Sequence, residues 1–151
     1  MRRIRLLIAP AAALAVASGI ALLPALTLAT PASAQASCDG TSLILGFDES
    51  NNTVGAIRVP TLGNGTGNTD CVLGAGNAGP AVARLQIALD ECNLHAGLAV
   101  DSDYGPLTQQ AVINVQRAEH VTQDGVFGPM TGILMHWPQA GSNGTICDIV
   151  D

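Results

Sequence analysis

Acidic side chains outnumber basic ones in this chain of 151 residues, which has 12 Asp and Glu, 6 Arg and no Lys. Three of the arginines stand within the first five positions, and the sequence after them carries a net charge of −9. Neutralisation of phosphate charge supplies most non-specific affinity for nucleic acids, so this balance excludes a nucleic-acid-binding protein. The same charge disfavours attraction to anionic lipid surfaces.

The first 36 residues have the pattern of a secretory signal peptide. A basic start is followed by an uncharged run from Leu6 to Ala36, and small residues at alternate positions offer cleavage after Ala34 or after Ala36. The run is also long enough for a membrane anchor, but Pro24, Pro31 and the cleavage positions favour removal. We therefore expect a secreted protein with no stable membrane insertion after cleavage.

Four cysteines follow the leader: Cys38, Cys71, Cys92 and Cys147. An even number in an exported chain indicates disulfides, and four cysteines allow three pairings. We favour Cys38–Cys71 and Cys92–Cys147, because each bridge ties one segment to itself and the second fixes the C-terminal tail to the end of a helix. The alternative is a metal site, but Cys92 and His95 form only half of a zinc motif, so we expect no metal.

Residues 37–75 are expected to form a disulfide-closed N-terminal extension that is rich in Gly, Asn and Thr. Within it, Ser42–Phe47 and Thr53–Val59 have the composition of short strands around a turn at Asp48–Asn52. The segment Thr61–Asp70 has the Gly, Asn and Thr content of a loop. The extension is therefore predicted to contain a β-hairpin.

Three helices are predicted between residues 76 and 138, each after a Gly-Pro pair. Proline suits the first helical position because its missing N–H would be unpaired there. Apolar residues then recur at helical spacing: Val82, Leu85 and Leu89 in the first helix, Leu107, Ala111, Val115 and Ala118 in the second, and Met130, Ile133, Leu134 and Trp137 in a short third. We expect a mainly α fold, a compact three-helix bundle, followed by a tail at 139–151.

A short motif occurs twice in the helical part, from Val100 to Thr108 and from Gln123 to Thr131. The register is 23 residues throughout, and each copy contains Asp, an aromatic residue, Gly-Pro and Thr in the same order. Internal repeats report on architecture, so the two copies predict two similar loops that lead into helices.

Three motifs in order carry a resemblance to a known family: G-x-A-V-A-R-L-Q from Gly79, V-D-S-D-Y-G-P-x-T from Val100, and D-G-V-F-G-P-x-T from Asp124. The helical part resembles peptidoglycan-binding domains of the three-helix type. The resemblance implies a non-catalytic module that docks onto bacterial cell-wall peptidoglycan and is often attached to a wall-cutting enzyme. The chain departs from the family at Ser102, where Gly is usual, and we expect no attached enzyme domain.

The candidate ligand-binding residues lie in or beside the two repeat loops. Arg117 is a candidate partner for a stem-peptide carboxylate, and Tyr104 with Trp137 could supply an apolar platform. We expect the recognition edge at the first loop, with the second loop as its packed counterpart. The full set is Asp101, Asp103, Tyr104, Gln109, Gln116, Arg117, Asp124, Phe127 and Trp137.

A purely structural interpretation of the same loops stays open. Asp101 and Asp124 can accept hydrogen bonds from the backbone N–H groups that follow them, and Gly105 and Gly128 would permit the turn into each helix. The two helical glutamines, Gln86 and Gln116, fit either a buried helix edge or a groove.

The sequence predicts no catalytic residues and no cofactor. The histidines lack metal-site spacing, no G-x-S-x-G is present, and the cysteines are expected to be oxidised. Asp101 and Asp103 begin like a calcium loop, but Gly105 occupies the third ligand position. We therefore predict a secreted, cell-wall-associated peptidoglycan-binding protein that is not an enzyme. The alternative is an envelope interaction or regulatory protein that keeps the bundle but binds a protein partner.

Overall fold

The computed structural model describes three stretches of the chain, residues 35–47, 53–139 and 146–150. The expected signal peptide, apart from its last two residues, and the expected turn at 48–52 lie outside the described residues. Strands β1 (Gly40–Phe47) and β2 (Thr53–Thr61) form an antiparallel hairpin. This hairpin is the one that the sequence predicted, with each strand slightly longer than expected.

Three helices follow the hairpin: α1 (Pro80–Glu91), α2 (Pro106–Ala118) and α3 (Pro129–Leu134). Each begins at the proline of a Gly-Pro pair, as predicted, and the preceding glycine is the N-cap. Proline starts these helices readily because the first N–H of a helix has no intrahelical partner to lose.

The third helix is shorter than expected. It ends at Leu134, and Trp137 belongs instead to β3 (Trp137–Pro138), which pairs with β4 (Cys147–Asp148). Four residues that were expected in the helical core are also exposed on the surface: Leu107, Ala118, Met130 and Ile133.

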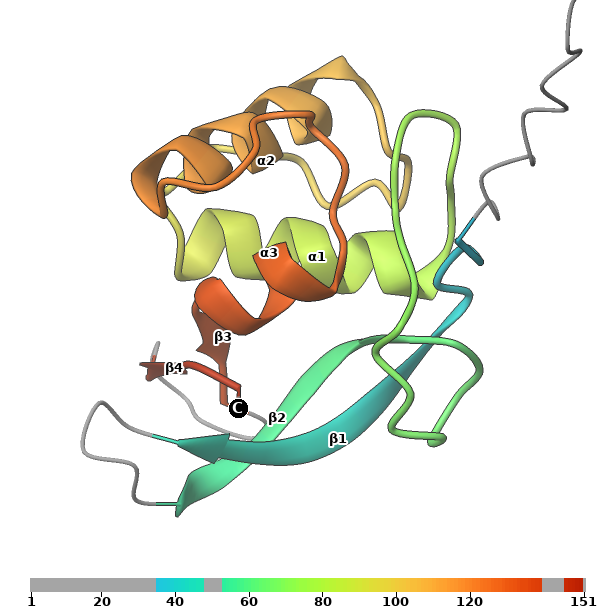
Figure 1. Cartoon of the computed structure of the whole chain (residues 1–151), viewed down its shortest axis with the longest axis vertical. Coiled ribbons are helices and arrows are strands. Elements are labelled where there is room, and N and C mark those ends of the chain that lie inside the picture. Colours follow the sequence, from blue (N-terminus) through green and yellow to red (C-terminus); the bar gives the residue numbers. More distant parts are fainter. Residues whose placement is uncertain (1–34, 48–52, 140–145, 151) are drawn as a thin grey trace, which may run out of the picture. The chain divides into compact units, whose positions relative to one another are not determined.

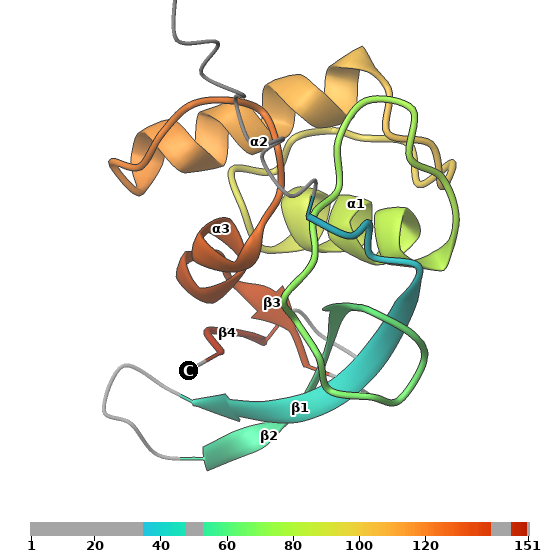
Figure 2. The ribbon, with the colours of Figure 1, turned by 45° about the vertical axis from the view of Figure 1, so that its right-hand side comes forward.

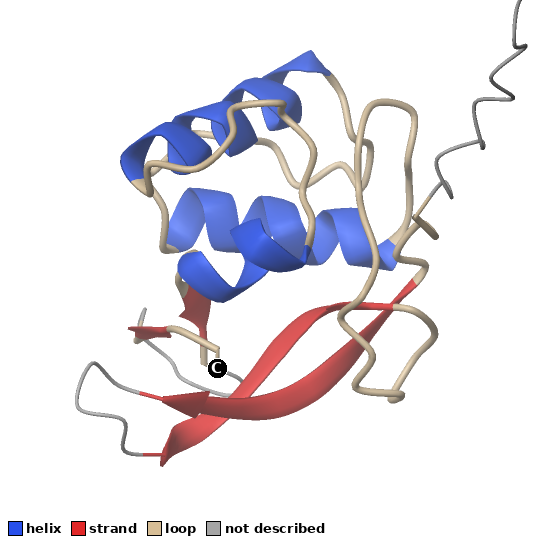
Figure 3. Ribbon diagram, in the orientation of Figure 1, coloured by secondary structure: helices blue, strands red, loops and turns tan. Residues whose placement is uncertain are grey.

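Helix α1 lies between the hairpin on one side and α2 on the other (Figures 1 and 2). Helices and strands therefore occupy opposite sides of the fold (Figure 3). Ile57 and Val59 of β2 are buried in the same core as Leu85 and Leu89 of α1. The expectation of a helical bundle with an N-terminal extension is thus refined, because the hairpin supplies part of the core.

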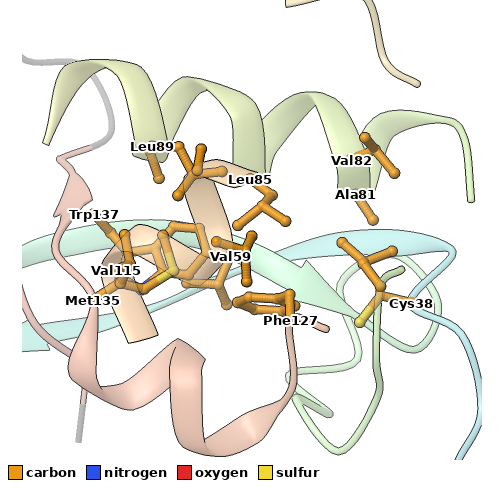
Figure 4. Close-up of a cluster of buried hydrophobic side chains, with 14 of the residues drawn as sticks. Cys38, Val59, Ala81, Val82, Leu85, Leu89, Val115, Phe127, Met135 and Trp137 are labelled. Atoms are coloured by element: carbon orange, nitrogen blue, oxygen red, sulfur yellow. The ribbon is translucent and has the colours of Figure 1, made fainter. Parts of the chain in front are cut away.

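The core centres on the face of α1 that turns toward the hairpin. Figure 4 shows Leu85 and Leu89 above Trp137, Val59 and Phe127. The rings of Phe127 and Trp137 meet edge to face, with centroids 5.9 Å apart. Edge-to-face packing is favourable for the quadrupoles of two aromatic rings. Because Phe127 precedes α3 and Trp137 belongs to β3, their contact packs these two segments together.

Arg84 ties α1 to both neighbouring strands. Its Nε donates to the carbonyl of Arg58 at 2.5 Å, and its Nη2 donates to the carbonyl of Pro138 at 2.6 Å. Burial is the main cause that lowers the pKa of this guanidinium from its ordinary value, but an arginine stays charged at physiological pH.

Both expected disulfides are present. Cys38–Cys71 closes the N-terminal segment onto the loop before α1, and Cys92–Cys147 joins the C-terminal cap of α1 to β4. The second bridge therefore fixes the tail to a helix end, as the sequence predicted.

Candidate functional site

The first repeat loop is built around the side chain of Gln86, which α1 holds fully buried. Its Nε2 donates to Asp101 Oδ1 at 2.7 Å, to the Asp103 carbonyl at 3.0 Å and lies 3.1 Å from Thr108 Oγ1. Its Oε1 accepts from the Ser102 N–H at 3.0 Å. One glutamine therefore fixes the whole first loop to α1.

The second loop repeats this frame around Gln116 of α2. Its Nε2 donates to Asp124 Oδ1 at 2.8 Å and to the Val126 carbonyl at 3.0 Å, and lies 3.3 Å from Thr131 Oγ1. Its Oε1 accepts from the Gly125 N–H at 3.0 Å. The sequence left the place of the two glutamines open, and the structure shows both beneath their loops.

Each aspartate also fixes its own loop. Asp101 Oδ1 accepts from the N–H of Asp103 at 3.0 Å, and Asp124 Oδ1 accepts from the N–H of Val126 at 2.9 Å. Both bonds are the local contacts expected from the sequence. The N–H of Asp103 and then the amide of Gln86 hold the pKa of Asp101 below its ordinary value. A carboxylate that accepts such bonds is stabilised in its charged form.

The backbone of each loop is left-handed at the residue after the aspartate. Ser102 and Gly125 both have φ of 67°, whereas Gly105 and Gly128 are extended at −87° and −147°. Gly105 and Gly128 do lie at the turn into each helix, as expected, but the positive φ of each loop falls at Ser102 and Gly125 instead. The glycine that the family usually has at position 102 would serve this conformation, since only glycine adopts it without steric cost.

We predict opposite effects on stability for exchanges at these equivalent positions. Ser102→Gly should raise the free energy of unfolding by about 0.5–1 kcal/mol, because it relieves a left-handed serine. Gly125→Ser should lower it by about 2 kcal/mol, because a Cβ there would lie 2.7 Å from Gln109 Cγ and 3.1 Å from Ile113 Cγ1. Urea unfolding gives the free energy of unfolding of both variants. A change in the same direction for the two variants would contradict the prediction.

The segment before α1 joins the two loops. Leu73 and Phe127 exchange both backbone hydrogen bonds at 2.9 Å, and the N–H of Tyr104 donates to the Asn77 carbonyl at 2.9 Å. The hydroxyl of buried Tyr104 donates to the Gly125 carbonyl at 2.9 Å, and burial is the main cause that raises its pKa. The two loops are thus one connected unit.

This unit buries several of the predicted binding residues. Tyr104 is 3% exposed, Gln116 2%, Phe127 4% and Trp137 0%, and Trp137 Nε1 donates to the Gly132 carbonyl. The platform expected from Tyr104 and Trp137 is therefore inside the protein. These side chains therefore lie beneath the surface residues of the two loops and not on the surface itself.

A hollow of about 520 Å³ lies beside the second loop. Gln116 and Asp124, two of the predicted residues, line it, together with ten residues that were not predicted to bind a ligand: Gln35, Val72, His120, Val121, Thr122, Val126, Gly128, Pro129, Met130 and Thr131. None of the residues of the first repeat, Val100 to Thr108, lines this hollow. Met130 was expected in the helical core, like Leu107 at the equivalent position of the first repeat, and both are exposed, so no signal in the sequence pointed to this hollow.

The other predicted residues lie outside this hollow. Asp101 and Asp103 are exposed on the first loop. Gln109 lies over Gly125, and Arg117 donates to the amide oxygens of Gln123 and Asn114 at 3.2 Å. A second hollow of about 210 Å³ lies between α2 and the loop after α1, and none of the predicted binding residues lines it.

Within the described stretches, no group of three or more His, Cys, Asp and Glu side chains could hold a metal ion. In the same stretches no helix is long and apolar enough to cross a membrane. The residues that line the hollow offer one carboxylate, one imidazole, two hydroxyls, amides and aliphatic surface.

Two like loops that lead into the last two of three helices define a small module with an internal repeat. Residues 78–135 of this module match the family described as "Putative peptidoglycan binding domain", and this part of the chain belongs to that family. The resemblance noted from the three sequence motifs is confirmed.

Several known proteins are similar to the chain. A zinc D-Ala-D-Ala carboxypeptidase of Streptomyces albus G is 34% identical over 118 residues, which cover 77% of this chain and 38% of that protein. The N-terminal domain of SleB is 31% identical with a TM-score of 0.39, covering 41% of this chain and 84% of that one. A peptidoglycan-binding protein of Clostridioides difficile, solved with glutamine hydroxamate, is 23% identical with a TM-score of 0.41, covering 59% and 53%. The chain thus spans well under half of the curated relative.

Proposed function

We propose that this protein binds cell-wall peptidoglycan without catalysis and that the ligand docks in the hollow beside the second repeat loop. Family membership of residues 78–135 supports the class of ligand. The observation that carries the location is the concave surface itself, which two predicted residues, Gln116 and Asp124, share. Concave surfaces with a few fixed polar groups are the usual place for ligand binding.

The proposal places the protein at the cell wall after export. Purified sacculi should retain the disulfide-bonded protein above a reduced and denatured control. Because the sequence after the first five residues carries a charge of −9, sacculi stripped of anionic polymers should retain more, and added salt should narrow the difference. Failure of stripped sacculi to retain the protein would contradict the proposal and favour the alternative of an envelope protein partner.

The location is tested with a matched pair of exposed residues. Met130 lines the hollow and is 59% exposed, while Leu107 holds the equivalent place in the first repeat and is 75% exposed. We expect Met130→Arg to weaken retention by about tenfold, since a long charged side chain blocks a groove, and Leu107→Arg to leave it unchanged. If Leu107→Arg has the larger effect, the site lies at the other hollow, which Leu107 lines.

A further inference from the structure

The charged residues that line the hollow favour one kind of charged group on a peptide ligand. Asp124 is the one carboxylate among the residues that line it, and none of those residues is Arg or Lys. Arg117, the expected partner for a carboxylate, instead contacts Gln123 and Asn114. The hollow therefore suits a cationic group of the ligand and offers no guanidinium to an anionic one.

The carboxylate of Asp124 is held ready for such a group. Its Oδ1 accepts from Gln116 and from the Val126 N–H, and these two bonds fix the orientation of the side chain. Its Oδ2 accepts no hydrogen bond from any described residue. One oxygen of this exposed carboxylate is hydrogen-bonded within the protein. The other can accept a hydrogen bond from an ammonium group without rearrangement of the side chain.

The rest of the hollow combines polar residues, Gln35, Gln116, His120, Thr122 and Thr131, with an aliphatic side. Val72, Val126, Pro129 and Met130 line it, and Met130 is more than half exposed. Tyr104, Phe127 and Trp137 are buried, so none of these three rings offers a face on which a sugar could stack. The lining favours a peptide with small apolar side chains over a glycan strand.

We propose that the hollow recognises a primary alkylammonium group carried by a short aliphatic peptide, through Asp124. In peptidoglycan this group is the free side-chain amine of the diamino residue of a stem peptide. Forming a peptide cross-link converts that amine into an amide and removes its charge. The protein would therefore prefer uncross-linked stems, an inference that rests on the proposed function and adds the ligand group to it.

Acetylation of the amine tests the inference. Binding is measured by calorimetry with a soluble muropeptide monomer, once with its side-chain amine free and once acetylated. Because a partly exposed charge pair contributes modestly, we expect acetylation to weaken binding by about five- to tenfold. Equal affinity for the two forms would overturn the inference, and so would retention of the protein by sacculi without any binding of the free-amine monomer.

Two variants assign the effect to its residue. Asp124→Asn keeps the Oδ1 acceptor that holds the loop but removes the charge, so it should bind both peptides equally and weakly. Asp101→Asn removes the same charge from the equivalent loop, outside this hollow, and should keep the wild-type preference for the free amine. Loss of the preference in Asp101→Asn alone would overturn the inference in favour of the first loop. Sacculi that retain wild type equally before and after acetylation would refute the inference while leaving the proposed function intact.

Discussion

Replacement of Gln116 by leucine should destabilise the protein by about 3–5 kcal/mol, one of the two largest effects that the structure predicts. The side chain is 2% exposed and satisfies Asp124, Gly125 and Val126 with its two amide atoms. Leucine has a similar volume but bonds none of them, and each buried group left without a partner costs about 1–3 kcal/mol. Because water can reach the exposed Asp124 and replace one lost hydrogen bond, the total loss of stability is smaller than the sum over all three groups.

Urea unfolding measures this loss, and the internal repeat provides its comparison. Gln86→Leu should cost a similar amount, because Gln86 makes the same set of bonds to the first loop. Gln110→Leu is the control on the exposed face of α2, where the side chain donates only to Asn114, and it should stay within about 0.5 kcal/mol of wild type. A loss of stability below about 1 kcal/mol for Gln116→Leu would mean that water molecules replace the hydrogen bonds of the glutamine to the loop.

Features set by neighbouring residues in the chain could be predicted from the sequence. The Gly-Pro pairs gave the starts of all three helices, because proline at the first helical position is a local preference. The 23-residue register predicted two like loops, and Asp101 and Asp124 make the local bonds expected of them. The strand-like composition of Ser42–Phe47 and Thr53–Val59 around a turn predicted the hairpin, which is also a local feature.

Features set by tertiary packing could not be predicted. A glutamine on a helix can face a groove or lie beneath a loop, and only the loop's position decided for Gln86 and Gln116. Burial of Tyr104 and Trp137 depends on the hairpin and on the segment around Leu73, which come from distant parts of the chain. The hollow likewise joins Val72 to Met130, and no spacing rule brings these residues together.

Removal of the Cys38–Cys71 disulfide is the other large effect, and we expect Cys38→Ala with Cys71→Ala to cost about 4 kcal/mol or more. The bridge closes 33 residues and Cys92–Cys147 closes 55, so loop entropy alone gives about 3.7 and 4.2 kcal/mol. We expect burial to reverse this order of the two stability losses. Cys38 and Cys71 are 3% and 0% exposed within the core, whereas Cys92 and Cys147 are only half-buried. Alanine at the first pair therefore also leaves a cavity.

The two bridges should differ in their effect on binding as well. Cys38 donates its N–H to the carbonyl of Val72, and Val72 in turn donates to the carbonyl of Ala36, so the first bridge fixes a wall of the hollow. The second bridge lies at the far end of α1, and neither of its cysteines lines the hollow. Unfolding curves and retention on sacculi, measured for both double variants where each is still folded, separate the two roles. Greater loss of stability and of retention from the Cys92–Cys147 variant would show that loop entropy outweighs burial and that the wall at Val72 holds without its disulfide.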